Sequence, residues 1–287
     1  MNRVARVIRC TLVLKPLAYL LFGLVLTLAF ALAPPSAQAA DTEVDVELVL
    51  AVDVSRSMSA MELEIQRRGY AEALVSEAVV KAVTSGLHGK VAITYVEWAG
   101  QFSQRTIVPW TLIENTADAQ AFALKVTANF NSSLRRTSIS GALDHATTLF
   151  NGNGFKGIRR VIDVSGDGPN NDGRTVVPAR DAAIAKGIVI NGLPLMTKDG
   201  MGVQWHLNDL DEYYRQCVTG GPGSFVIPVL TWEKFPEAVR QKLVLELART
   251  TDTPIQKAAY KGATQDGYDC EIGEKIWENI RRNWDEP

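Results

Sequence analysis

Residues 48–59 read Leu-Val-Leu-Ala-Val-Asp-Val-Ser-Arg-Ser-Met-Ser, and this stretch decides the fold class. Its apolar first half is typical of a strand buried on both faces, as in a parallel sheet. Oxygen-bearing side chains then alternate at Asp53, Ser55 and Ser57, and an extended turn would direct all three to one side. Residues 59–62, Ser-Ala-Met-Glu, have the spacing of a capping box that starts a helix. The loop is therefore predicted to lie at the carboxyl end of a parallel strand, where open α/β sheets bind ligands.

The rest of the chain continues this alternation of strands and helices. Runs rich in β-branched residues predict strands, and apolar residues at helical spacing predict helices. The expected strands are 44–54, 91–98, 104–112, 160–165, 188–195 and 225–230. The expected helices are 61–83, 118–128, 139–150, 176–186 and 232–248. This order predicts an α/β fold: a Rossmann-like, doubly wound and mostly parallel central sheet with helices on both faces.

Two further motifs carry a family resemblance. Residues 137–143 read Thr-Ser-Ile-Ser-Gly-Ala-Leu, and residues 161–168 read Val-Ile-Asp-Val-Ser-Gly-Asp-Gly. With the Asp-x-Ser-x-Ser stretch, they resemble the three elements of a von Willebrand factor type A domain, over roughly residues 44–248. Within that superfamily the chain most resembles a bacterial exported branch, a domain-of-unknown-function family that shares the Ser-Gly-Asp-Gly ending and a Tyr-Tyr…Cys insertion.

The resemblance implies a metal-ion-dependent adhesion site. In the family pattern, Ser55, Ser57 and Thr137 would contact the cation directly, and Asp53 and Asp167 would act largely through water. Hydroxyl and carboxylate oxygens suit Mg²⁺, or alternatively Mn²⁺ or Ca²⁺, and not zinc or copper. Because neutral direct ligands leave positive charge on the cation, a protein partner that presents a carboxylate is expected to complete the site.

Three positions depart from the family pattern. Arg136 stands where a glycine usually precedes the threonine, and Gly166 stands where a threonine commonly precedes the aspartate. Asp163 interrupts a strand that should be apolar, so it needs a buried partner, for which His145 or a nearby arginine is expected. Asp163 lies too far down the strand to be expected as a ligand.

Two other functions are compatible with the same residues. A metal with open positions can activate water, so a metal-assisted periplasmic hydrolase is one alternative. No general base has a clear place beside the site, and we assign no catalytic residue. A scaffold with a vestigial site is the other alternative, because short polar residues after strands also serve as caps and turns. The leading interpretation is a metal-dependent protein-binding module that is not an enzyme.

Residues 1–39 have the three parts of an export signal. Four basic residues precede an apolar run over 17–33, and residues 37–39 read Ala-Gln-Ala. A periplasmic or secreted protein is expected, with an uncleaved inner-membrane anchor as the alternative because the run is nearly long enough to span a bilayer. Removing four of the 30 Lys+Arg leaves 26 against 32 Asp+Glu, a net charge of −6. This acidic balance argues against nucleic acid as a partner.

Two cysteines and two irregular segments lie outside the regular pattern. Cys217 and Cys270 remain after the signal, and an oxidising compartment favours a disulfide over two free thiols. The insertion at 196–224 is long enough to be a functional loop or lid. The tail at 249–287 is predicted to end in a helix whose apolar residues recur every four positions from Ile272, so that it packs on the body.

Overall fold

A computed structural model describes residues 40–128, 134–197, 207–248 and 267–285. Contacts divide the chain into Met1–Ala40 and Asp41–Pro287. The export signal predicted for residues 1–39 lies outside the described residues.

A five-stranded sheet in the order β3-β2-β1-β4-β5 forms the centre of the second unit. The strands are β1 (Thr42–Asp53), β2 (Val91–Trp98), β3 (Gln104–Ile113), β4 (Phe155–Gly166) and β5 (Ile188–Pro194). All neighbouring pairs run parallel except β2 and β3, which are antiparallel. The predicted mostly parallel sheet is confirmed.

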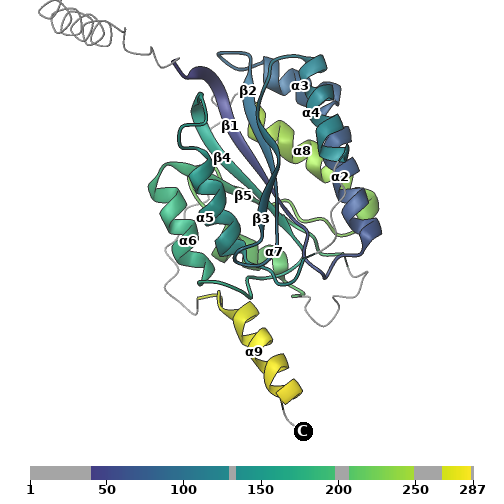
Figure 1. Cartoon of the computed structure of the whole chain (residues 1–287), viewed down its shortest axis with the longest axis vertical. Coiled ribbons are helices and arrows are strands. Elements are labelled where there is room, and N and C mark those ends of the chain that lie inside the picture. Colours follow the sequence, from purple (N-terminus) through teal and green to yellow (C-terminus); the bar gives the residue numbers. More distant parts are fainter. Residues whose placement is uncertain (1–39, 129–133, 198–206, 249–266, 286–287) are drawn as a thin grey trace, which may run out of the picture. The chain divides into compact units, whose positions relative to one another are not determined.

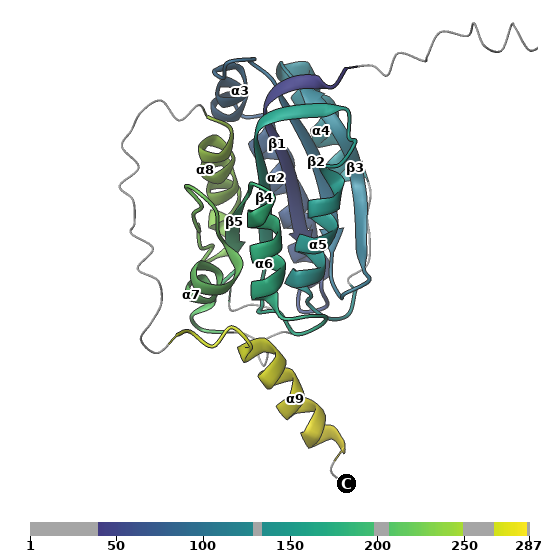
Figure 2. The ribbon, with the colours of Figure 1, turned by 90° about the vertical axis from the view of Figure 1, so that its left-hand side faces the viewer.

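Helices cover both faces of this sheet (Figure 1). One face carries α2 (Ala60–Leu74), α3 (Glu77–Thr84), α4 (Thr116–Ala128) and α8 (Phe235–Leu247). The other face carries α5 (Ile139–Leu149) and α6 (Val176–Ala185), as the turned view also shows (Figure 2). The remaining helical segments are α7 (Leu210–Tyr213), the π-helix η2 (Tyr214–Val218), the 3-10 turn η3 (Trp232–Lys234) and α9 (Ile272–Asp285).

The central strand β1 sends successive side chains into two separate cores. Leu48, Leu50 and Val52 pack with the helices of one face, and Val49 and Ala51 pack with α5 and α6. Each of these side chains is almost completely buried, which stabilises the fold by about 1.5–3 kcal/mol for a leucine. A register shift by one residue would exchange the two faces, so this packing fixes where β1 ends.

Two sequence-based predictions about the elements are wrong in detail. The single helix expected over 61–83 is two helices, because Ser76 accepts a hydrogen bond from Val79 N at 3.4 Å and caps α3. The strand expected over 225–230 consists of isolated bridges, of which two join Val226 to Gly192 and Val229 to Leu195. Pro228 lies between these bridges and has no N–H group to continue a ladder.

Asp163 has its buried partner on α8, and the expected histidine or arginine partner is wrong. Lys242 Nζ lies 2.7 Å from Asp163 Oδ1 and 2.6 Å from Glu246 Oε1. The side chains of all three residues are at most 1% exposed. Asn191 of β5 donates a hydrogen bond to Glu246 Oε1 at 2.9 Å. These ion pairs and this hydrogen bond anchor α8 to β4 and β5, and no local sequence pattern indicates them.

The buried cluster makes the stability of the protein depend on pH. Burial raises the pKa of Asp163 from its usual 3.8 to about 7, although the Lys242 ammonium opposes the shift. Between these two values the folded state binds more protons than the unfolded state, so stability falls as the pH rises. Relative to an Asp163→Asn variant, the wild-type protein should lose up to about 4 kcal/mol between about pH 4 and pH 8. Urea unfolding at both pH values measures this difference, and parallel pH profiles would contradict it.

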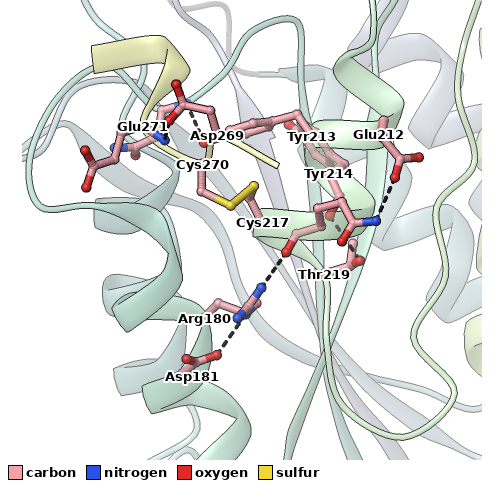
Figure 3. Close-up of a disulfide and its surroundings, with 12 residues drawn as sticks. Arg180, Asp181, Glu212, Tyr213, Tyr214, Cys217, Thr219, Asp269, Cys270 and Glu271 are labelled. Carbon is pink, nitrogen blue, oxygen red and sulfur yellow. Dashed lines mark hydrogen bonds and ion pairs between the residues drawn. A yellow bond between two sulfur atoms is a disulfide. The ribbon is translucent and has the colours of Figure 1, made fainter. Parts of the chain in front are cut away.

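The predicted disulfide between Cys217 and Cys270 is confirmed (Figure 3). It joins η2 of the insertion to the segment directly before α9, with the two Cα atoms 5.5 Å apart. Residues 198–206 of the insertion lie outside the described part, but Tyr213 and Tyr214 are fully buried. The Tyr213 ring also contacts Tyr268, with centroids 6.1 Å apart. The described part of the insertion thus packs inward and holds the start of α9.

Candidate metal centre

The loop after β1 is fixed by hydrogen bonds within itself and to α2. Asp53 Oδ1 accepts a hydrogen bond from Ser55 N at 2.7 Å, and Gln66 Nε2 donates to the Asp53 carbonyl at 2.9 Å. The predicted capping box is present, since Ser59 N donates to Glu62 Oε2 at 2.6 Å and the Ser59 hydroxyl accepts from Glu62 N. The loop therefore leaves the sheet in one defined conformation.

Four of the five predicted site residues line one cavity of about 270 Å³: Ser55, Ser57, Thr137 and Asp167. The Ser57 hydroxyl donates to Asp167 Oδ1 at 2.8 Å and lies 3.0 Å from the Ser55 hydroxyl. The fifth residue, Asp53, is completely buried and does not line the cavity. The structure thus brings together residues that are up to 112 positions apart, on three loops at one end of the sheet.

Two asparagines that sequence reasoning missed hold the other two loops together. Thr137 N donates to Asn171 Oδ1 at 3.0 Å, and Asn171 N donates back to the Thr137 carbonyl at 2.8 Å. Ser140 N, in the first turn of α5, donates to Asn170 Oδ1 at 3.0 Å. The run Gly-Pro-Asn-Asn at 168–171 is typical of a turn, which was the available indication. These contacts fix the backbone of Thr137 at the start of α5.

Tyr214 explains why Gly166 replaces the family's threonine. A Cβ atom at Gly166 would lie 2.9 Å from Tyr214 Oη and 3.0 Å from Asp53 Oδ2, which leaves no space for a larger side chain. Both of these oxygens are buried and lack a hydrogen-bond partner among the residues that the structure describes. Sequence reasoning treated the Tyr-Tyr pair as a family signature and did not place Tyr214 beside the site.

The two neighbouring carboxylates Asp53 and Asp167 favour a cation beside them. Burial raises the pKa of Asp53 well above its usual value, and the nearby charge of Asp167 raises it further. A cation beside the two carboxylates would relieve this repulsion. Over the described ranges no group of three or more His, Cys, Asp and Glu side chains could hold a metal. A cation here would therefore depend on the hydroxyls of Ser55, Ser57 and Thr137, a donor set that suits hard ions such as Mg²⁺.

The departure at Arg136 has a conformational consequence. Arg136 has φ of 74°, and it is the single non-glycine residue with positive φ in the described part of the chain. This left-handed conformation costs a residue with a side chain roughly 1–2 kcal/mol, which explains the glycine of the family pattern. The Arg136 guanidinium lies 3.4 Å from the centre of the Trp277 ring, so α9 contacts the rim of the cavity.

Comparison with known proteins assigns the chain to a protein family. The family model described as "Protein of unknown function (DUF1194)" matches residues 43–251. The chain belongs to this family. All five predicted site residues of the DUF1194 chain lie within the matched range, which ends before α9 begins. A search of curated proteins finds no match to the sequence.

Solved structures share the fold of this DUF1194 chain at low sequence identity. Proximal thread matrix protein 1 from the mussel byssus matches with TM-score 0.52 and 14% identity, over 73% of this chain and 49% of that one. The pilus adhesin SpaC from Lactobacillus rhamnosus GG matches with TM-score 0.51 and 12% identity, over 72% of this chain and 32% of that one. The chain thus spans half or less of these proteins.

One further structure of the mussel protein has the same fold and contains a metal ion. It was solved with a zinc-occupied MIDAS motif, the metal-ion-dependent adhesion site, and matches with TM-score 0.50 and 16% identity over 73% of this chain and 49% of that one. Together with the family match, these structures confirm the von Willebrand factor type A-like fold that the sequence motifs indicated.

Proposed function

We propose that this protein is an exported binding module, and not an enzyme, that captures a partner protein through a divalent cation. The hydroxyls of Ser55, Ser57 and Thr137 would hold the cation, and Asp53 and Asp167 would act behind them, largely through water. The observation that carries the proposal is the short chain of contacts from Ser55 through Ser57 to Asp167 along one open cavity. We expect Mg²⁺, with Mn²⁺ or Ca²⁺ as alternatives.

The partner's chemistry follows from the charge on the donor atoms. Serine and threonine hydroxyls are neutral, so the protein would neutralise the positive charge of a bound divalent cation only in part. The cation would also keep a coordination position that can accept an electron pair. Asp53 is buried behind the cavity, so it balances charge without occupying the open side. A carboxylate of a partner protein would complete the coordination. Among the proteins of similar fold, one is a pilus adhesin and another a thread matrix protein, which supports a role in protein contacts.

We place the protein in the periplasm or outside the cell. The Cys217–Cys270 disulfide supports an oxidising compartment, and the basic and apolar composition of residues 1–39 supports export. Across the described ranges, no helix combines the length and apolar character that crossing a bilayer requires.

The test measures Mg²⁺ binding and Mg²⁺-dependent peptide binding by calorimetry. The peptide is a capped pentapeptide, Gly-Gln-Asp-Gln-Gly, whose one carboxylate is the aspartate. The double variant Ser55→Ala, Ser57→Ala should bind Mg²⁺ at least about 100-fold more weakly, since loss of even an outer contact costs about 10–100-fold. The control is Ser85→Ala, an exposed serine after α3, which should match the wild type. Equal peptide binding in EDTA and in Mg²⁺ would overturn the proposal.

A further inference from the structure

The cavity of the candidate metal centre has a second wall that the metal site does not use. Its lining includes Arg56, Arg135 and Arg136, together with Trp277 of α9. Building on the proposed function, we propose that these residues form an anion subsite that binds a second carboxylate of the same partner segment. The ligand would then be an acidic segment of a protein with two carboxylates on neighbouring residues, one directed to the metal site and one to the arginines.

The geometry of Arg136 is the first support. Its backbone is held in the left-handed region, and such strain in a non-glycine residue concentrates at functional sites. Its guanidinium stacks on the Trp277 ring at 3.4 Å. Stacking uses the flat face of a guanidinium and leaves the N–H groups along its edge to donate, in the fork that matches a carboxylate. Trp277 therefore orients Arg136 without neutralising its charge.

Trp277 is itself held in place by three contacts at the start of α9. The disulfide joins Cys270 to the body of the protein (Figure 3). Asn170 Nδ2 donates to Glu274 Oε1 at 2.7 Å, which ties α9 to the loop that carries Asp167. Gly273 packs so closely on the Asn170 carbonyl that any Cβ atom would overlap with it. Both ribbon views show α9 at the end of the sheet where β1 ends (Figures 1 and 2).

The charges around the cavity also favour an acidic ligand. Arg56 and Arg135 are exposed, and no ion pair within the described residues involves either of them or Arg136. The carboxylate of Asp172, which acts electrostatically on Arg136, already accepts a hydrogen bond from Gln101 N at 2.8 Å. The whole chain has a net charge of −2, so this basic rim is a local feature. Local positive charge attracts anionic segments and speeds their association.

The size of the cavity limits the ligand. A volume of about 270 Å³ is slightly below the range of about 300–1,000 Å³ for small-molecule sites. It admits one or two acidic side chains of an extended segment and excludes a folded domain. This limit favours two neighbouring acidic residues over a broad charged surface.

The experiment compares two capped pentapeptides in Mg²⁺: Gly-Gln-Asp-Gln-Gly with one carboxylate, and Gly-Glu-Asp-Glu-Gly with three. Wild-type protein should bind the second peptide about tenfold more tightly, a difference of about 1.4 kcal/mol. Arg136→Gly and Trp277→Ala should each reduce this preference to about threefold or less. Glycine adopts the φ of Arg136 without strain, so the first variant tests the side chain in a folded protein. Arg68→Gln on α2, an arginine 64% exposed, is the matched control and should keep the preference.

The outcomes separate this inference from the proposed function. A tenfold preference that persists in both Arg136→Gly and Trp277→Ala would overturn the anion subsite. If wild-type protein in Mg²⁺ binds neither peptide, the proposed function itself is overturned. Preference for the three-carboxylate peptide that is retained in EDTA and lost in Arg136→Gly would support the subsite while contradicting the metal-dependent docking.

Discussion

Replacing Lys242 by methionine is expected to destabilise the fold by about 3–5 kcal/mol. The Lys242 ammonium lies 2.7 Å from Asp163 and 2.6 Å from Glu246, and all three side chains are buried. Removing the one cation would leave two buried carboxyl groups without a counter-charge. Their desolvation as carboxylates, or the free energy of protonating them at neutral pH, would then oppose folding. Urea unfolding at neutral pH, followed by circular dichroism, measures the change.

Two further variants test the cause of this loss. Lys156→Met removes an ammonium from an exposed pair, in which Lys156 and Glu43 are 72% and 60% exposed, and should change stability by less than about 1 kcal/mol. Adding Asp163→Asn and Glu246→Gln to Lys242→Met removes the uncompensated charges, and should recover more than half of the loss. A loss of less than about 1 kcal/mol in Lys242→Met alone would contradict the proposed energetics.

Asp53→Asn is expected to stabilise the metal-free protein and to weaken Mg²⁺ binding. Burial and the adjacent Asp167 raise the pKa of Asp53, so the ionised carboxylate destabilises the metal-free fold as the pH rises. Asparagine keeps an oxygen to accept from Ser55 N and removes the charge. The variant should therefore melt at a higher temperature than wild type in EDTA at about pH 8. It should also bind Mg²⁺ at least about tenfold more weakly.

Scanning calorimetry in EDTA and Mg²⁺ titration by isothermal calorimetry give the two readouts. Asp181→Asn is the matched control, because Asp181 on α6 is 57% exposed and does not line the cavity. It should leave both the melting temperature in EDTA and the Mg²⁺ affinity at the wild-type values. If Asp53→Asn binds Mg²⁺ with the wild-type affinity, Asp53 is not part of the metal site.

The features that could be predicted from the sequence are those that local spacing determines. The alternation of apolar residues in β1 fixes its two buried faces, and the Ser59–Glu62 spacing gives the capping box that the structure contains. Because parallel strands end at one edge of a sheet, the convergence of Ser57 and Asp167 also follows from strand order once the family pattern is recognised.

The features that could not be predicted depend on pairing between distant segments. Asp163 signalled a buried partner, but nothing in its neighbourhood pointed to Lys242, which lies on the last helix of the domain. Tyr214 and Trp277 reach the site through the packing of the insertion and α9, so their side chains have no local pattern that indicates a role. The break between α2 and α3 depends on a single cap at Ser76, within a run that keeps helical periodicity.

The two edges of the sheet restrict how a partner can approach. The outer edge of β5 is already hydrogen-bonded to the segment after η2: Ile190 exchanges two bonds with Gly220, and Val229 N donates to the Pro194 carbonyl. On the opposite edge, β3 contains Pro109, which has no N–H group to donate, and its register with β2 shifts near Tyr95. Such features keep sheets from pairing edge to edge. A partner that extends the sheet with its own strand would therefore find no continuous backbone template at either edge.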